Sequence, residues 1–143
     1  RSLSSAASDV YKRQVYDVGY DAVNQYGIVS LDGDQVQSIV EKPNKEDAPS
    51  TLAFCGRYIF TDDFSSLLDH YSVEEHGELQ SIAILEHWMN EGNLRAHVLD
   101  STVSWYDSGM PFVWLTSQID HALQRPEYGE ELAAWLRQRL NQS

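Results

Sequence analysis

The sequence predicts an α/β domain in which a mixed sheet is flanked by helices. Short runs that are β-branched or that alternate polar and apolar residues, which are typical of strands, alternate along the chain with longer segments whose apolar residues have helical spacing. Two of these runs, 26–31 and 35–41, are joined by Asp32-Gly33-Asp34, which is typical of a tight turn. Because a hairpin makes neighbouring strands antiparallel, we expect the sheet to be mixed and not purely parallel.

The strands are predicted from alternating patterns and from the residues that stop them. Residues 15–16 resemble the end of a strand, and the hairpin follows them. The second strand of the hairpin stops at Pro43, which has no N–H to donate to a sheet. After a polar loop, the run 52–60 forms another strand with Gly56 in its middle, and 94–99 forms the last one.

The helices are predicted from apolar stripes and from the residues at their ends. Thr61 or Asp62 can cap the first helix, and Gly77 opens the second. Pro111 suits the first turn of a third helix, and Pro126 separates it from a last one. The residues expected to face the core are Phe64, Leu67 and Leu68 in the first helix, Leu79, Ile82, Ala83, Leu85 and Met89 in the second, Phe112, Leu115, Ile119 and Leu123 in the third, and Leu132, Trp135, Leu136 and Leu140 in the last, 130–140.

Composition excludes several classes of function. The 143 residues carry a formal net charge of −12, so the phosphates of nucleic acid or of an anionic membrane would be repelled. No apolar run approaches the roughly 18 residues of a membrane span. The single cysteine, Cys55, excludes an internal disulfide, and its apolar surroundings predict a buried thiol and not a reactive one. A soluble cytoplasmic domain is the default expectation.

The first 14 residues differ from the rest of the chain. They begin rich in serine and alanine, and they show no apolar period, no helix cap and no apolar core of a signal peptide. One interpretation is a disordered tail. The other is that segment 1–14 is not native, because residues 4–14 resemble the in-frame translation of a transposon adapter used in sequencing libraries. In that case the domain is 15–143, and whatever preceded Val15 is missing.

Three places combine residues that can carry chemistry. Glu41-Lys42 puts a carboxylate and an ammonium at a strand end, which suits a ligand with hydroxyls and a phosphate, although a solvated strand end is the plain alternative. Asp107-Ser108-Gly109 follows a strand, where ligands gather in open α/β sheets, and it is also an ordinary turn sequence. Gly77-Glu78-Leu79-Gln80 can be simply a first helical turn with a favourable acid.

Several short motifs, read in order, resemble those of one family. They are Tyr26-Gly27-Ile28-Val29, Val40-Glu41-Lys42-Pro43, Ala48-Pro49-Ser50, Gly56-Arg57-Tyr58, Gly77-Glu78-Leu79-Gln80, Tyr106-Asp107-Ser108-Gly109 and 126–131. This series resembles the sugar-1-phosphate nucleotidyltransferases, and the bacterial uridylyltransferases that act on glucose 1-phosphate are the nearest branch. The resemblance covers nearly everything from Val15 onward. It implies the C-terminal half of a Rossmann-like nucleotide-diphospho-sugar transferase fold, without its nucleotide-binding N-terminal part.

The resemblance also implies a reaction and a site. The substrates would be a nucleoside triphosphate, UTP, and a sugar 1-phosphate, glucose 1-phosphate, and the products UDP-glucose and pyrophosphate. Lys42 would hold the sugar phosphate, and Glu41 would accept hydrogen bonds from sugar hydroxyls. Gly27 and Gly56 would let main-chain groups reach the sugar. Asp107 would be a catalytic carboxylate on Mg²⁺. The full-length protein would be a homo-oligomer, and the fragment alone would be inactive.

The chain departs from the family pattern in two places. Where the family reads Glu-Ile-Gln-Leu-Thr-Asp, this sequence has Glu78-Leu79-Gln80-Ser81-Ile82-Ala83, so the last acid is lost. After Asp107, the family's Ile-Gly is Ser108-Gly109 here, and residues 110–114 do not follow the uridylyltransferase pattern closely. A related thymidylyl- or cytidylyltransferase, a non-catalytic regulatory paralogue, and an unrelated α/β binding domain therefore stay open as alternatives.

Overall fold

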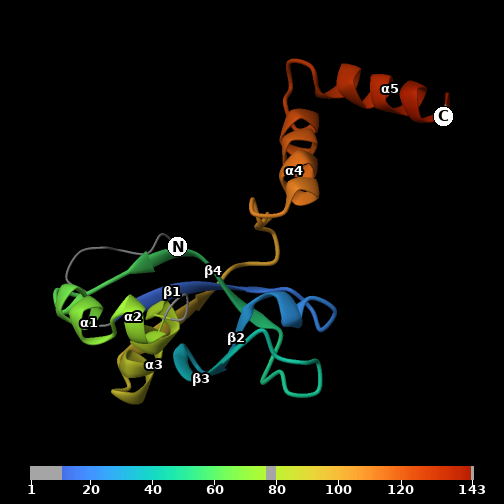
Figure 1. Cartoon of the computed structure of the whole chain (residues 1–143). Helices are drawn as coiled ribbons and strands as arrows, with labels where there is room; N and C mark the ends of the chain where they lie inside the picture. The colour runs from blue at the N-terminus through green and yellow to red at the C-terminus, as the bar shows by residue number, and fades with distance from the viewer. Residues whose placement is uncertain (1–10, 77–79, 143) are drawn as a thin grey trace. The chain divides into compact units, whose positions relative to one another are not determined.

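The computed structural model describes residues 11–76 and 80–142, which fall into two compact units that meet between Ser101 and Thr102 in the sequence. The first unit holds the sheet and the second holds two helices (Figure 1). The strands are β1 (Tyr11–Asp17), β2 (Gly27–Asp32), β3 (Gln35–Glu41), β4 (Leu52–Ile59) and β5 (Leu94–Val98). The helices are the 3-10 turn η1 (Val23–Gln25), α1 (Phe64–His70), α2 (Val73–His76), α3 (Gln80–Asn90), α4 (Pro111–Leu123) and α5 (Gly129–Leu140).

The sheet is mixed, as predicted, and it closes on itself. β1 pairs antiparallel with β4 and parallel with β5, while β2 pairs antiparallel with both β3 and β4. β3 and β5 meet at Gln35 and Arg95, so the order β1-β4-β2-β3-β5 forms a closed barrel. The Arg95 guanidinium supports this closure, because its Nη1 donates to Asp34 Oδ1 and to Gln35 Oε1, each at 3.3 Å. The closure was not predicted.

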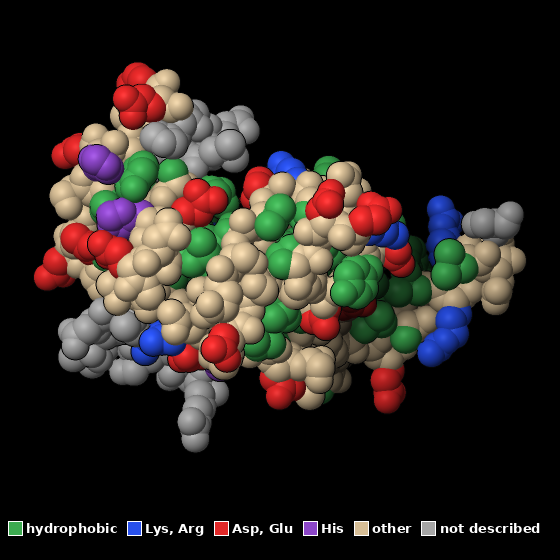
Figure 2. Space-filling model, turned by 90° about the horizontal axis from the view of Figure 1, so that it is seen from below, with side chains coloured by type: hydrophobic (Ala, Val, Ile, Leu, Met, Phe, Trp, Pro, Cys, Tyr) green, Lys and Arg blue, Asp and Glu red, His purple; other side chains and the backbone are tan. Residues whose placement is uncertain are grey.

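The main core lies between the strands and the helices α1 and α3. Trp88 of α3 is fully buried at 0% exposure, and its ring stacks on Tyr11 of β1 with centroids 3.4 Å apart. Leu67 of α1 and Leu85 of α3 are buried in the same cluster, as predicted. The prediction is wrong for Leu68, which is 37% exposed, and it missed Ile84 and Trp88, which are buried. A second, small cluster of Val23, Ile28 and Ala53 lies under η1. Acidic side chains are spread over the face seen in Figure 2.

The segment after α1 differs from the prediction. The structure begins α3 at Gln80, while Gly77 and Leu79, the expected start of this helix, lie outside the described residues. A short helix that was not predicted, α2, precedes it. The N-cap of α1 is Asp63 and not Thr61 or Asp62, because the Thr61 hydroxyl donates to the Asp63 carboxylate and leaves the helix without a side-chain cap.

The leader predicted over 1–14 is only partly described. Residues 1–10 lie outside the described part of the chain, but 11–14 are the first half of β1. The expectation of disorder is therefore wrong for 11–14, because these residues pair with both β4 and β5. Burial, followed by the hydrogen bond to Asp63, raises the pKa of Tyr11 to about 12. The non-native origin of segment 1–14 stays a prediction.

The second unit consists of a turn and the helices α4 and α5. Tyr106 OH donates to Asp120 Oδ2 at 2.9 Å, which ties the turn to α4. The predicted burial of the α4 stripe is wrong for Phe112 and Leu115, which are 75% and 51% exposed, because the described residues of this unit offer no sheet to cover that face. Trp135 of α5 is exposed in the same way. No helix among the described residues is long and apolar enough to cross a membrane.

Candidate functional site

A cavity of about 520 Å³ opens between the ends of β2 and β3 and the first turn of α3. Gly27 is the first residue of β2 and Glu41 the last residue of β3, and the two are paired across the sheet. The residues that line the cavity are Arg13, Gln25, Tyr26, Gly27, Glu41, Lys42, Phe54, Ser81 and Ile82. Three of the four substrate-binding residues predicted from the sequence, Gly27, Glu41 and Lys42, thus lie together.

Gly27 matters here because it has no side chain. A Cβ at this position would lie 2.8 Å from Glu41 Oε2, closer than carbon and oxygen tolerate. The carboxylate of Glu41 therefore lies directly over the backbone of Gly27, where a side chain of any other residue would displace it. The sequence predicted that this glycine would leave its main chain open to a sugar, and the structure adds that it makes room for a carboxylate.

Lys42 has an unusual backbone for a residue other than glycine. Its φ is 46°, in the left-handed region, and its N–H donates to the carbonyl of Tyr26 at 3.0 Å. Its ammonium lies 3.9 Å from Glu41 Oε1, and the side chain is 64% exposed. Strained conformations of this kind cost of order 1–3 kcal/mol and cluster at functional sites. The bend turns the chain out of β3 and leaves the ammonium at the mouth of the cavity.

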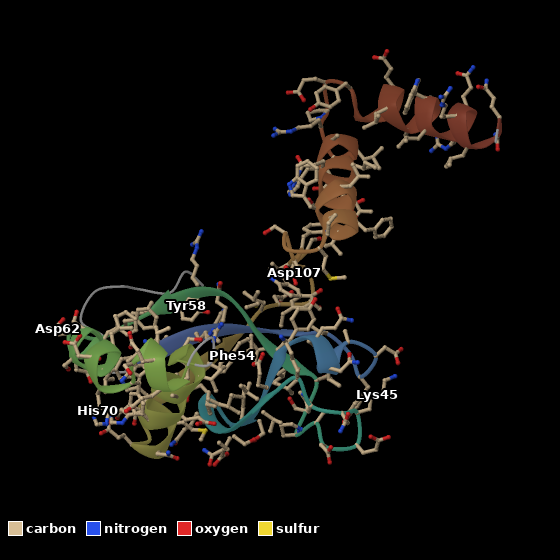
Figure 3. The ribbon with its side chains drawn as sticks, viewed as in Figure 1. Lys45, Phe54, Tyr58, Asp62, His70 and Asp107 are labelled. Atoms are coloured by element: carbon tan, nitrogen blue, oxygen red, sulfur yellow. The ribbon has the colours of Figure 1, made fainter. Side chains whose placement is uncertain are left out.

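Arg13 is a cation of the cavity that sequence reasoning missed. Its guanidinium lies 4.2 Å from the centroid of Phe54 and 4.0 Å from that of Tyr58, and it donates to the Tyr58 hydroxyl (Figure 3 labels both rings). Burial lowers the pKa of Arg13. It was missed because it lies in segment 1–14, for which a non-native origin was predicted.

Gly56, the fourth predicted substrate contact, is not among the residues that line the cavity. Its φ is 63°, and it lies where the pairing of β1 with β4 shifts register. The Gln14 side chain covers this bulge and accepts the Arg57 N–H at 3.0 Å. The structure therefore explains the glycine at position 56 by its conformation, because a bulge of this kind needs positive φ. Its contact with substrate stays a prediction.

Asp107, the predicted metal ligand, belongs to the second unit. Its Oδ1 accepts the Gly109 N–H at 2.9 Å, which closes the turn before α4 and orients the carboxylate. Among the described residues no three acidic, histidine or cysteine side chains converge on one point. Since Mg²⁺ is usually held by one or two carboxylates together with phosphates and water, a single preoriented carboxylate fits a part of such a site.

The lost acid at Ala83 does not fall in the cavity. Ser81 and Ile82 line it, whereas Ala83, one step further around the helix, faces a separate hollow beside Tyr71 and His87. In that hollow Tyr71 OH and His87 Nδ1 lie 3.1 Å apart. The departure from the family pattern at position 83 therefore leaves the contacts of Glu41 and Lys42 untouched.

Fold and cavity together define a class of protein: an α/β domain with a cavity into which backbone, a carboxylate and an ammonium converge. These groups belong to Gly27, Glu41 and Lys42. A carboxylate accepts hydrogen bonds from hydroxyls, and an ammonium pairs with a phosphate.

The chain belongs to the nucleotidyl transferase family, whose model matches residues 3–118. It is 31% identical to the UTP–glucose-1-phosphate uridylyltransferase of Streptococcus pneumoniae, over 94% of this chain and 48% of that protein. It resembles the UDP-glucose pyrophosphorylase from Acinetobacter baumannii with a TM-score of 0.72 and 26% identity, over 92% of this chain and 46% of that one. A UDP-glucose pyrophosphorylase complexed with UDP-glucose gives a TM-score of 0.67 at 25% identity, over 81% and 45%.

These comparisons confirm the predicted family and the predicted Rossmann-like α/β fold. The chain spans about half the length of the curated relatives it matches. The family match begins at residue 3, inside segment 1–14.

Gly27→Ala tests the packing of Glu41 over Gly27. The added methyl would displace the Glu41 carboxylate. If Glu41 binds a sugar phosphate, as the resemblance implies, we expect KM for that sugar phosphate to rise about tenfold, the value of one lost charged hydrogen bond of roughly 1.5 kcal/mol. Steady-state kinetics of the full-length protein measure this. Glu41→Gln in the Gly27→Ala background is the control. In that background Glu41→Gln should raise KM much less than it does in the wild type. An equal rise in both backgrounds would show that Gly27→Ala does not act through Glu41.

Proposed function

We propose that residues 15–143 are the sugar-phosphate-binding part of a UTP–glucose-1-phosphate uridylyltransferase. The full-length protein would transfer a uridylyl group from UTP to glucose 1-phosphate and release pyrophosphate. The observation that carries this proposal is the convergence of Gly27, Glu41 and Lys42 on one cavity in a member of the nucleotidyl transferase family. The names of the relatives support the choice of substrates.

The residues of the cavity have separate roles in this reaction. An oxygen of the sugar phosphate attacks the α-phosphorus of UTP, and pyrophosphate leaves. Two anions must approach each other, so positioning and charge neutralisation supply most of the catalysis. Lys42 neutralises the sugar phosphate, and Glu41 orients the sugar through its hydroxyls. No covalent bond to the protein forms.

A divalent metal ion, which we take to be Mg²⁺, fits this proposal. Asp107 would supply one carboxylate to it, and the ion would neutralise charge on the phosphates when bound. Among the described residues no group of three acidic, histidine or cysteine side chains lies together, so phosphate and water oxygens would supply most of the other ligands.

The proposal extends to partners and place in the cell. An acidic chain with a net charge of −12 is suited neither to nucleic acid nor to an anionic membrane surface. We therefore propose a cytoplasmic enzyme whose ligands are small molecules, and a homo-oligomer as the state of the full-length protein. Analytical ultracentrifugation of the full-length protein tests whether it is a homo-oligomer.

The test of the function begins with the reading frame upstream of Val15, which provides the full-length protein. We expect that protein to form UDP-glucose and pyrophosphate from UTP and glucose 1-phosphate, and residues 15–143 alone to form none. Robust turnover by residues 15–143 would overturn the second expectation. A preference for dTTP or CTP would favour the related thymidylyl- or cytidylyltransferases. The absence of turnover with every pair of substrates would favour a regulatory paralogue.

A further inference from the structure

One stripe of α5 is held against α4, and a neighbouring one is exposed. Gly129 is buried at the start of α5, and a Cβ at this residue would lie 2.3 Å from the carbonyl oxygen of Leu123, the last residue of α4. Leu132 and Leu136 follow Gly129 on the same side of the helix and are partly buried. Trp135 lies beyond the edge of this stripe and is 56% exposed. The largest apolar side chain of α5 is therefore not covered by α4.

Two opposite charges flank Trp135 on the exposed side of α5. Glu131 comes four residues before Trp135, and Arg139 comes four residues after it. Residues four apart in a helix lie on the same face, about 6 Å apart along the axis, so the three side chains form one row. All three are exposed. This α5 row has an acidic end, an aromatic centre and a basic end.

The α5 row is complementary to a second copy of itself turned end for end. With a two-fold axis at Trp135, the two indole rings meet, and Glu131 of each copy faces Arg139 of the other. A parallel arrangement would instead bring like charges together, which disfavours it. Buried tryptophans at the centre of an interface supply much of its affinity, whereas exposed ion pairs add little and set the orientation.

We propose that the α5 row is a contact surface between two copies of this chain, which pair antiparallel through Glu131, Trp135 and Arg139. A helix of 12 residues is only about 18 Å long, so this contact is the part of a larger interface that lies on the two-fold axis. The inference goes beyond the proposed reaction and rests on one part of the proposed function, the homo-oligomeric state of the full-length protein.

The test measures the dissociation constant for self-association of the full-length protein by sedimentation over a series of concentrations. Trp135→Ala should raise it at least about 30-fold, the usual effect of removing a tryptophan at the centre of an interface. Glu131→Arg and Arg139→Glu should each raise it about tenfold, because each change puts like charges opposite each other at both ends of the contact.

Two further samples test the pairing itself. Glu131→Arg mixed with Arg139→Glu should associate as tightly as the wild type, because every charge then meets an opposite charge on the other chain. The double variant Glu131→Arg/Arg139→Glu should also recover the wild-type dissociation constant, and its net charge is that of the wild type.

Glu130→Arg and Arg137→Glu are the matched controls. Both residues are exposed, in the same turns of α5 as Glu131 and Arg139, but on the side opposite Trp135. Their reversal has the same unfavourable interaction with the helix dipole, so it reports any loss of the helix itself. We expect both controls to keep the dissociation constant within about twofold of the wild type.

The outcomes separate the inference from the proposed function. If the wild type self-associates and Trp135→Ala, Glu131→Arg and Arg139→Glu leave its dissociation constant unchanged, or if the controls weaken it equally, only the inference is overturned. If the two single variants do not recover association when mixed, the antiparallel pairing is overturned. A wild type that stays monomeric overturns both the inference and the proposed homo-oligomer, while turnover of UTP and glucose 1-phosphate tests the proposed reaction independently.

Discussion

Replacing Lys42 by alanine should lower kcat/KM of the full-length protein for glucose 1-phosphate by about 10²–10³-fold, the usual effect of removing one group that stabilises a charged transition state. The ammonium lines the cavity beside Glu41, at 3.9 Å from its carboxylate, so it is placed to meet the anionic end of a ligand whose hydroxyls Glu41 would bind under the proposed function. The phosphate keeps its negative charge throughout the reaction, and nothing else predicted from the sequence on this wall of the cavity neutralises it.

The positive φ of residue 42 means that Lys42→Ala alone does not isolate the effect of the lost charge, so a second variant is needed. Alanine at a φ of 46° is strained, so lost activity in Lys42→Ala could come from a shifted strand end. Lys42→Gly removes the same charge, while glycine adopts this φ without cost. We expect Lys42→Gly to be as inactive as Lys42→Ala.

Lys45→Ala is the matched control for Lys42. Lys45 is an exposed lysine on the loop after β3, paired with Asp21 at 2.5 Å (Figure 3), and it does not line the cavity. Its replacement should leave kcat/KM within about twofold of the wild type, since exposed ion pairs contribute less than about 1 kcal/mol. Full activity of Lys42→Gly, or an equal loss in Lys45→Ala, would show that the charge at position 42 has no special role.

The hairpin and its neighbours could be predicted because their signals are local. β3 covers 35–41, as predicted. β2 begins and ends one residue later than predicted, and β4 ends one residue earlier. The alternation of side chains and the turn at Asp32-Gly33-Asp34 suffice for these elements. The closure of the sheet depends instead on the pairing of β5 with both β1 and β3. The paired residues Tyr11 and Leu94 are 83 positions apart, Gln35 and Arg95 are 60 apart, and no local pattern reports such pairings.

In the candidate site, too, the residues with local signals could be predicted and those brought in by long-range packing could not. Gly27, Glu41 and Lys42 are adjacent through one hairpin, so motifs in sequence order were enough to predict them. Ser81 and Ile82 reach the cavity only because α3 packs on the sheet, and they were predicted as ordinary helix residues. The bent backbone at Lys42 had no signal either, because a lysine is not expected in the left-handed region. Motif order thus predicted the residues at the strand ends, and only the fold brought the helix residues to them.

The position of Ala83 bears on the regulatory alternative. That alternative was encouraged by the loss of an acid in the α3 motif, but Ala83 faces the hollow beside His87 and not the cavity. The acid is therefore not missing from among the groups that would contact the sugar phosphate. The choice between an enzyme and a regulatory paralogue turns on Lys42 and Asp107, which both retain their charged side chains.

Asp107→Asn should lower kcat of the full-length protein by about 10²-fold and raise the Mg²⁺ concentration that gives half-maximal rate, since a bound metal ion supplies several kcal/mol of charge stabilisation. Asparagine keeps an oxygen that can accept the Gly109 N–H, which Asp107 Oδ1 accepts at 2.9 Å, so the turn should survive. The change therefore removes a charge with little change of shape. Titration of the initial rate with MgCl₂ at saturating substrates measures both effects.

Asp120→Asn is the control that shows whether the effect is specific to Asp107 or common to any carboxylate of the same unit. Asp120 lies on α4 and accepts the Tyr106 hydroxyl at 2.9 Å, a bond that asparagine can also accept. It should leave both kcat and the Mg²⁺ dependence unchanged, because the proposed function gives this carboxylate no part in binding the metal. If Asp107→Asn and Asp120→Asn shift the titration equally, the effect is one of net charge and Asp107 is not a ligand. If only Asp107→Asn shifts it, the turn that begins at Tyr106 has the function of presenting a carboxylate to the metal.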